Sequence, residues 1–168
     1  MNKAREDHSS SAIGNSVWVF GGINGSGPLN SIERLKICRD NLTLTARKWE
    51  TIDPHPDFSA RANSAVCTVS RHKMLILGGN VPKGYLSDIW IMNAKRKTMK
   101  KIAHAPFAFH CLGQAYAMRD GLVYSLVNNR EKGVCLVRFE VTSKSFDVIA
   151  EGMAGTFKSK QAQKMAMP

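Results

Sequence analysis

Two glycine pairs constrain the fold of this chain most strongly, because each pair ends an apolar run at the same place in a repeated unit. The run 17–20 leads into Gly21–Gly22, and the run 74–77 leads into Gly78–Gly79, 57 residues further along the chain. A leucine follows each pair by seven residues and an isoleucine by ten, namely Leu29 and Ile32, then Leu86 and Ile89. A period near 50 residues indicates a repeat architecture.

A third, divergent unit follows at about 108–151. Each unit closes on a bulky apolar residue: Trp49, Met99 and Phe146. The distance from Gly79 to Met99 is 20 residues, and the same distance separates Leu126 from Phe146, so Ser125–Leu126 stands where the glycines should be. Unit one is seven residues longer over this interval, and we expect the additional residues within about 38–48.

Each unit is predicted to form four short strands, because apolar and β-branched runs alternate with turn signals such as Gly14–Asn15 and Asp120–Gly121. The first strand of each unit is rich in small residues, which suits crowding near a central axis. The expected strands are 9–13, 16–20, 31–37 and 48–52 in unit one, 63–69, 73–77, 88–92 and 99–102 in unit two, and 112–118, 122–126, 134–141 and 145–149 in unit three.

Four antiparallel strands per unit, with a glycine pair and a late bulky residue, resemble the kelch family, whose repeats form the blades of β-propellers. The matching residues are Arg5, His8, Gly21–Gly22, 29–33 and Trp49 in unit one, and Arg61, Gly78–Gly79 and 86–89 in unit two. In unit three the resemblance depends on residue spacing alone. The resemblance implies an all-β fold, a partial kelch-type β-propeller of about three four-stranded antiparallel blades.

The domain organisation follows from the repeats. We expect an N-terminal lead at 1–4, kelch-like repeats at 5–151 (divided into 5–60, 61–107 and 108–151), and a basic tail at 152–168 that is mobile or forms a short helix. Propellers usually have four to eight blades, so three cannot close a ring. We favour a fragment of a larger propeller. The alternatives are assembly with itself or another chain, and an open arc.

Charge and cysteine content limit the other classes. The net charge is +11, concentrated in 95–101 and in Lys158, Lys160 and Lys164. We interpret these lysines as solvated turn charges rather than a surface for nucleic acid or acidic lipid, because no aromatic residue interleaves 95–101 for base stacking. Four widely spaced cysteines predict thiols within strands rather than a zinc site or disulfides. A polar N-terminus and the lack of a long apolar run predict a cytoplasmic protein without a membrane span.

Catalytic signals are weak. The five histidines form no metal-ligand cluster, and no nucleophile elbow occurs. A two-histidine site from His55 and His104 is a less favoured alternative to solvated loop histidines. We therefore expect no catalytic residue, no metal, no cofactor and no enzyme activity, and we rank a catalytic propeller last.

A binding surface remains. The loops after the second and fourth strands, 23–28, 80–85, 127–133, 53–60 and 103–109, share one face, and loops on a rigid base commonly carry recognition residues. The resemblance implies that this face binds a partner protein, as a non-catalytic interaction module that acts as a ubiquitin ligase substrate adaptor or a scaffold. The candidate contacts are Asn24, Ser26, His55, Phe58, Asn80, Lys83, Tyr85, His104, Phe107, Asn129 and Arg130.

Two kinds of contact are expected within this set. Tyr85 and the phenylalanines would anchor the partner, while Lys83 and Arg130 would meet its acidic groups. The alternative for Phe58, Phe107 and Phe109 is packing between blades. The rival functions for the whole chain are a fragment with no independent function, and a basic surface that binds nucleic acid or acidic lipid.

Overall fold

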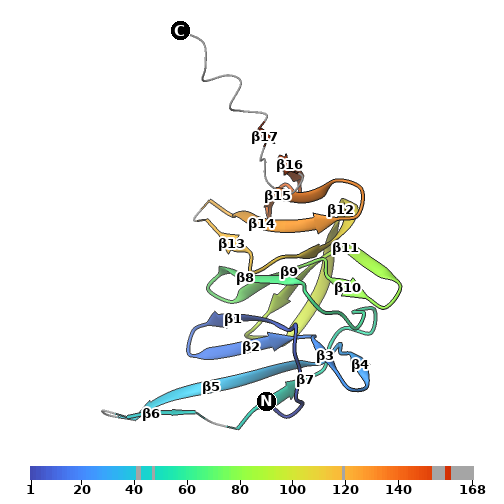
Figure 1. Cartoon of the computed structure of the whole chain (residues 1–168). Helices are drawn as coiled ribbons and strands as arrows, with labels where there is room; N and C mark the ends of the chain where they lie inside the picture. The colour runs from blue at the N-terminus through green and yellow to red at the C-terminus, as the bar shows by residue number, and fades with distance from the viewer. Residues whose placement is uncertain (41–42, 47, 119, 153–157, 160–168) are drawn as a thin grey trace.

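The computed structural model describes residues 1–40, 43–46, 48–118, 120–152 and 158–159, with the side chains of 39–40, 43–46 and 158–159 left out. Every regular element in these residues is a β-strand, and the strands form three antiparallel blades that follow one another (Figure 1). The all-β, kelch-type partial propeller predicted from the repeats is therefore confirmed.

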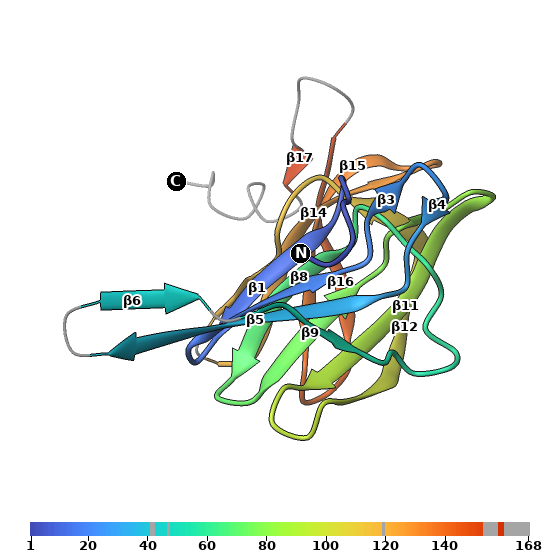
Figure 2. The ribbon, with the colours of Figure 1, turned by 90° about the horizontal axis from the view of Figure 1, so that it is seen from below.

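Blade one contains the strands of the first repeat. They are β1 (Ser9–Ile13), β2 (Ser16–Phe20), β5 (Ile32–Asp40) and β7 (Glu50–Ile52), with a small hairpin of β3 (Ile23–Asn24) and β4 (Gly27–Pro28) after β2. The predicted insertion is confirmed. The far half of β5 pairs with β6 (Thr43–Ala46), and this two-stranded arm projects from the body (Figure 2).

Blades two and three share one ten-stranded sheet. Blade two comprises β8 (Ala65–Ser70), β9 (Lys73–Leu77), β10 (Asn80–Val81), β11 (Gly84–Asn93) and β12 (Thr98–Cys111). Blade three comprises β13 (Tyr116–Ala117), β14 (Leu122–Asn129), β15 (Gly133–Glu140) and β16 (Phe146–Gly152), followed by β17 (Lys158–Ser159). Residues 158–159 of the tail, expected to be mobile or helical, thus pair with β16 as a strand.

Strand β12 departs from the prediction, because residues 103–109 were expected to form a loop. Asp88 pairs with His104 and Leu86 with Phe109, so residues 105–108 bulge out of the β11–β12 ladder. The end of β12 then pairs with β14 in blade three. The predicted strand 112–118 is accordingly reduced to β13, which pairs with the near end of β14, while the preceding residues 110–111 pair with its far end.

The glycine pairs make the second strand of blades one and two end in a sharp turn. Gly21 and Gly78 have φ of +61° and +52°, in the left-handed region that disfavours other residues. A Cβ on Gly21 would lie 2.2 Å from the Arg61 carbonyl oxygen, and one on Gly78 would lie 2.6 Å from the Phe109 ring. The glycines therefore permit close contact with the next blade. In blade three, which lacks them, β14 continues without a break to Asn129.

The same backbone hydrogen bonds join blade one to blade two and blade two to blade three. The Gly22 N–H donates to the Arg61 carbonyl at 2.8 Å, and the Gly79 N–H donates to the Phe109 carbonyl at 3.0 Å. Phe109 thus occupies the place of the repeat arginine in unit three. The small residues expected in the first strands also meet, since the Ser9 hydroxyl lies 2.9 Å from that of Ser64.

Two apolar cores lie between the blades. Blades one and two enclose a cluster around Trp18, Phe20 and Trp90, while blades two and three enclose a cluster around Phe109 and Val127. All five side chains are buried. Each blade therefore depends on its neighbour for its hydrophobic core.

A buried arginine organises each of the first two repeats. Arg61 donates to both carboxylate oxygens of Asp88, at 2.6 and 2.8 Å, and to the Gly78 carbonyl at 3.0 Å. Arg5 donates to the Gly21 carbonyl at 2.7 Å and forms an ion pair with Glu33. The two repeats are offset by 57 residues, so Asp88 of the second corresponds to Ser31 of the first rather than to Glu33. The carboxylate therefore moves by two positions, which keeps it on the same face of the strand.

Burial by itself would raise the pKa of Asp88, but the hydrogen bonds and charge of Arg61, together with the Trp90 indole N–H, outweigh it and leave the pKa below its ordinary value of 3.8. Burial opposes ionisation of Glu33 as well. There the N–H groups of Asn2 and Lys3 and the charge of Arg5 lower the pKa overall. Both carboxylates are therefore ionised at neutral pH.

We expect Gly78→Ala to destabilise the fold by more than about 1 kcal/mol, because it adds strain at positive φ and a clash with Phe109. Gly25→Ala is the matched control, since a Cβ there meets nothing within 4 Å. Urea unfolding followed by tryptophan fluorescence measures both. Equal stability of the two variants would contradict the close-contact role of Gly78.

We expect Asp88→Asn to cost about 3–5 kcal/mol at pH 7, because it leaves Arg61 buried without its charge partner. A carboxyl group with a lowered folded-state pKa stabilises the fold above its unfolded pKa, and this stabilisation is lost as the pH falls through the folded value. Wild-type stability should therefore decrease below about pH 4, while Asp88→Asn should change less. Urea unfolding at pH 7, 5 and 3 tests this, with the exposed Asp53→Asn as control. An equally steep acid loss in Asp88→Asn would refute it.

Candidate functional site

The candidate site lies between two hairpins at one end of blades two and three. The hairpin of β10 and β11 turns at residues 82–83, and the hairpin of β14 and β15 turns at residues 130–132. The β12 bulge lies against both, and the three segments line a pocket of about 380 Å³. Tyr85, Phe107, Asn129 and Arg130 all line it. The structure therefore brings four of the predicted contact residues together.

Tyr85 lies at the centre of this site. Its half-buried ring stacks on His110, with the centroids 4.7 Å apart and 17° between the planes. The guanidinium carbon of the exposed Arg130 lies 5.0 Å from the Tyr85 ring centroid. Burial lowers the pKa of His110, so this histidine is neutral at physiological pH. The Tyr85 ring is thus held in place by His110, and the accessible guanidinium of Arg130 lies close to it.

Phe107 is presented by the β12 bulge. Its ring packs edge-on against Phe146 at 5.6 Å and against Phe109 at 6.0 Å. The Lys132 ammonium lies 5.7 Å from the ring, and Glu151 accepts a hydrogen bond from it at 2.7 Å, which raises the pKa of Lys132. Phe107 is therefore half-buried: it packs against the core between blades, as in the alternative interpretation, and it also lines the pocket.

Asn129 fixes the shape of the pocket from within. Its side-chain nitrogen donates to the Ala108 carbonyl at 2.8 Å, which ties the bulge to the β14–β15 turn. Its side-chain oxygen accepts from the N–H groups of Glu131 and Lys132, both at 2.9 Å. Asn129 was predicted as a surface contact, but it is buried and its amide is used inside the turn. It holds Arg130 and Phe107 in place.

The other predicted contacts in hairpins lie outside the pocket. Asn24 and Ser26 occupy the β3–β4 hairpin of blade one, where the Asn24 side-chain oxygen accepts from the Ser26 N–H at 2.9 Å. Lys83 is exposed at the β10–β11 turn, close in sequence to Tyr85. The Asn80 side-chain oxygen accepts from the Asn63 side chain at 3.4 Å.

The predicted contacts of the inter-blade segments also lie elsewhere. Phe58 is only 1% exposed, with its ring edge-on to Trp90 at 5.4 Å and the Arg61 guanidinium 4.1 Å above it. Phe58 therefore belongs to the core, and its assignment to the binding surface was wrong. His55 lies 5.4 Å from the Trp90 ring, and His104 lies 3.3 Å from the Ser87 hydroxyl on blade two.

Sequence reasoning missed several residues of the pocket. Pro106, Glu131 and the supporting His110 were not proposed as contacts, although the first two lie in the predicted loop ranges. The loop ranges were a sufficient signal for their position in the chain. The bulge that turns Pro106 and Phe107 toward the β14–β15 turn depends on pairing between distant strands, which the local sequence does not encode.

Among the described residues, no three His, Cys, Asp or Glu side chains are grouped so as to hold a metal ion. The cysteines lie in strands as predicted, with Cys67, Cys111 and Cys135 buried and Cys38 half-buried. Burial raises the pKa of Cys67 and of Cys111 to about 12, so both are protonated thiols at neutral pH. Within the same part of the chain, no helix has the length and apolar character needed to cross a membrane.

Comparison with known proteins agrees with this geometry. Residues 4–52 match the family model of the Kelch motif. This segment contains Arg5, Glu33 and all the strands of blade one. Among curated proteins, none matches the chain. The second blade repeats the arginine, carboxylate and glycine network of the first, and together with the matched motif this supports a kelch-repeat family. Kelch repeats are in general protein-interaction modules.

Proposed function

We propose that this chain is a non-catalytic protein-interaction module that binds its partner at the Tyr85 pocket between blades two and three. The observation that carries the proposal is the exposed Arg130 guanidinium, 5.0 Å from the centroid of a Tyr85 ring that is itself stacked on His110. Tyrosine and arginine are the residue types that most often dominate binding energy at protein interfaces. The chain would serve as a substrate adaptor or a scaffold.

The chemistry of the pocket favours a partner segment that carries an acidic residue beside an apolar one. Arg130 is an exposed cation of the pocket, Lys83 is an exposed cation at the adjacent β10–β11 turn, and Glu131 is the one acidic residue among the described lining residues. The Phe107 ring and Pro106 supply apolar surface on the side of the bulge. An acidic group would meet Arg130 while its apolar neighbour rests on Phe107.

The test is affinity capture from cell extract, quantified by mass spectrometry, with the wild type, with Tyr85→Ala plus Arg130→Ala, and with Arg71→Ala. Arg71 is an exposed cation in the β8–β9 turn at the opposite end of the blades. We expect the double variant to weaken binding of the true partner by about 30-fold, as for the loss of a hot spot. The Arg71 variant should bind normally.

Tyr85→Phe separates recognition from folding in this experiment. It keeps the ring that stacks on His110 and receives Arg130, so the partner should be retained. A protein captured equally by the wild type and by the double variant does not use this pocket. If no captured protein is selectively lost in the double variant, the proposed site is wrong.

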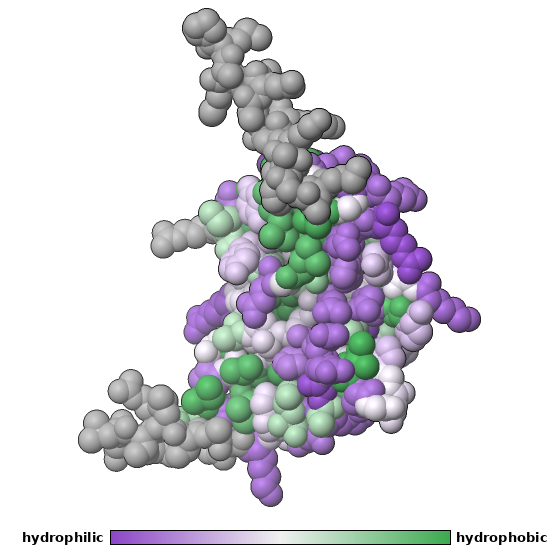
Figure 3. All heavy atoms as spheres, viewed as in Figure 1, coloured by the Kyte–Doolittle hydropathy of each residue, from purple (hydrophilic) through white to green (hydrophobic). Residues whose placement is uncertain are grey.

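A second candidate function rests on a different surface. Four apolar residues of blade three are exposed, namely Leu112 (51%), Tyr116 (70%), Met118 (57%) and Leu126 (43%). They belong to the inner strand segments and the adjoining part of β14, and Figure 3 shows apolar surface over this blade. In blades one and two, the corresponding strands touch the next blade.

We infer that a second copy of the chain covers this face. The bond from the Asn63 N–H to the Asp7 carbonyl joins blades one and two, and the bond from the Cys111 N–H to the Asn63 carbonyl joins blades two and three. A head-to-tail copy would continue this series with its own Asp7 opposite Cys111. Two copies would supply six blades, within the usual range for a closed propeller.

Light scattering after size exclusion, over a range of protein concentrations, tests the second candidate. We expect a dimer for the wild type and a monomer for Tyr116→Asp plus Met118→Asp, because charges on the apolar face oppose docking. Tyr116 and Met118 are exposed, so the variant should fold normally. A wild-type monomer at every concentration would reject the second copy and favour the interpretation as a fragment of a larger propeller.

A further inference from the structure

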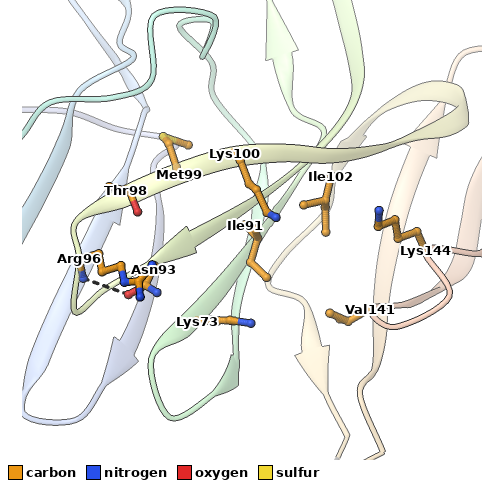
Figure 4. A pocket seen from close by; sticks show the side chains of 10 residues that line it. All are labelled: Lys73, Ile91, Asn93, Arg96, Thr98, Met99, Lys100, Ile102, Val141 and Lys144. Carbon is orange, nitrogen blue, oxygen red and sulfur yellow. Dashed lines mark hydrogen bonds between the residues drawn. The ribbon is translucent and has the colours of Figure 1, made fainter.

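A second pocket lies at the opposite end of blades two and three, and it shares no lining residue with the Tyr85 pocket. It has a volume of about 440 Å³. The start of β9, the β11–β12 hairpin and the turn between β15 and β16 line it (Figure 4). This volume is within the range of small-molecule sites in proteins.

The strand register gives this pocket an aliphatic floor and a basic rim. Ile91 pairs with Lys100, and Ile102 lies at an irregularity of the same ladder; the side chains of all three line the pocket (Figure 4). Val141 and Lys144 approach from blade three, across the gap seen in Figure 4. The other face of the same strands is buried against blade one through Trp90 and Met92.

Four cations line this pocket, and no acidic residue is among the lining residues that the structure describes. Lys73, Arg96, Lys100 and Lys144 are exposed, and none of them forms an ion pair within the described part of the chain. Elsewhere the chain does pair exposed cations with acids, as with Lys97 and Glu50. The Asn93 side-chain oxygen accepts from the Arg96 N–H at 3.0 Å and thereby orders the turn.

We propose that this pocket binds a small organic molecule carrying at least two phosphate groups. Four cations around one pocket, without an ion pair among the described residues, favour a ligand that brings several negative charges into a small volume. Each phosphate monoester brings between one and two of them, whereas a carboxylate brings one. Lysine and arginine are the usual phosphate ligands. The aliphatic floor of Ile91, Ile102 and Val141 receives the body of the ligand.

The surroundings disfavour a single-stranded nucleic acid. Sequence-tolerant binding of single strands uses aromatic side chains on which bases stack, and no aromatic residue is among the described residues that line this pocket. Since the ligand would contact Lys100 of blade two and Lys144 of blade three, it joins the two blades. Binding therefore stabilises the folded chain, by linkage between ligand binding and folding.

Isothermal titration in 0.15 M salt tests the site, with inositol hexakisphosphate and tripolyphosphate as probes. The pocket variant is Lys100→Ala plus Lys144→Ala. The control is Lys36→Ala plus Lys48→Ala, which removes the same charge from two exposed lysines outside both pockets. We expect saturable binding to the wild type, at least a 10-fold weaker affinity in the pocket variant and less than a 2-fold change in the control. The melting temperature of the wild type should rise with probe concentration.

Several outcomes would overturn the proposal. Absence of saturable binding to both probes would do so. An equal loss in the pocket variant and the control would do so as well, because it would show general attraction to a chain of net charge +11. Tighter binding of a single-stranded oligonucleotide than of either probe would indicate a nucleic-acid surface instead.

A further comparison distinguishes a soluble ligand from a lipid headgroup, by offering a related headgroup free in solution and in a membrane. Inositol 1,4,5-trisphosphate in solution is compared with vesicles that contain phosphatidylinositol 4,5-bisphosphate. Binding of the soluble headgroup, lost in the pocket variant, supports a small-molecule ligand, and additional binding of the vesicles identifies a lipid headgroup as a source. Binding to vesicles with none to the soluble headgroup rejects the pocket in favour of a membrane surface.

Discussion

The arrangement of blades depends on the hydrogen bonds and ion pair that the buried arginine of each regular repeat makes. Its guanidinium holds the carbonyl of the first glycine and a carboxylate of the neighbouring strand, in Arg5 and again in Arg61. A guanidinium removed from water destabilises a fold unless its hydrogen bonds are satisfied, so the chain must turn at the glycine to supply that carbonyl. The Arg61 carbonyl also accepts a hydrogen bond from Gly22 of the preceding blade. One residue thus sets both the shape of its blade and the contact with the blade before it.

The third repeat replaces this polar network with aromatic packing. Phe109 takes the place of the arginine and contacts Phe107 and Phe146. With no guanidinium to satisfy and no glycine pair to turn the strand, β14 and β15 extend as an uninterrupted hairpin. This longer hairpin brings Arg130 beside Tyr85 of blade two. The irregularity of the third repeat and the position of the proposed partner site therefore have the same cause.

The sequence was sufficient to predict the elements that repeat. The bounds of β1, β2 and β9 agree with the expected ranges to the residue, and the insertion in blade one was placed correctly. The errors lie where strands of different blades pair, in the β12 bulge and the divided inner strand of unit three. The proposed sites show the same limit. Tyr85 and Arg130 could be selected as loop residues, but the burial of Phe58 and the convergence of Lys73 and Lys144 on one pocket depend on contacts between repeats.

Strand β12 has a mechanical consequence. It pairs with β11 for most of its length and with β14 at its end, so one unbroken segment belongs to two blades. Blade one, by contrast, has its own sheet and reaches the remainder through an irregular connection. Rotating the third blade relative to the second would break the β12–β14 residue pairs, whereas blades one and two are separate sheets joined by side-chain packing and by backbone hydrogen bonds. Blades two and three are thus one continuous sheet, and both pockets described above lie within it.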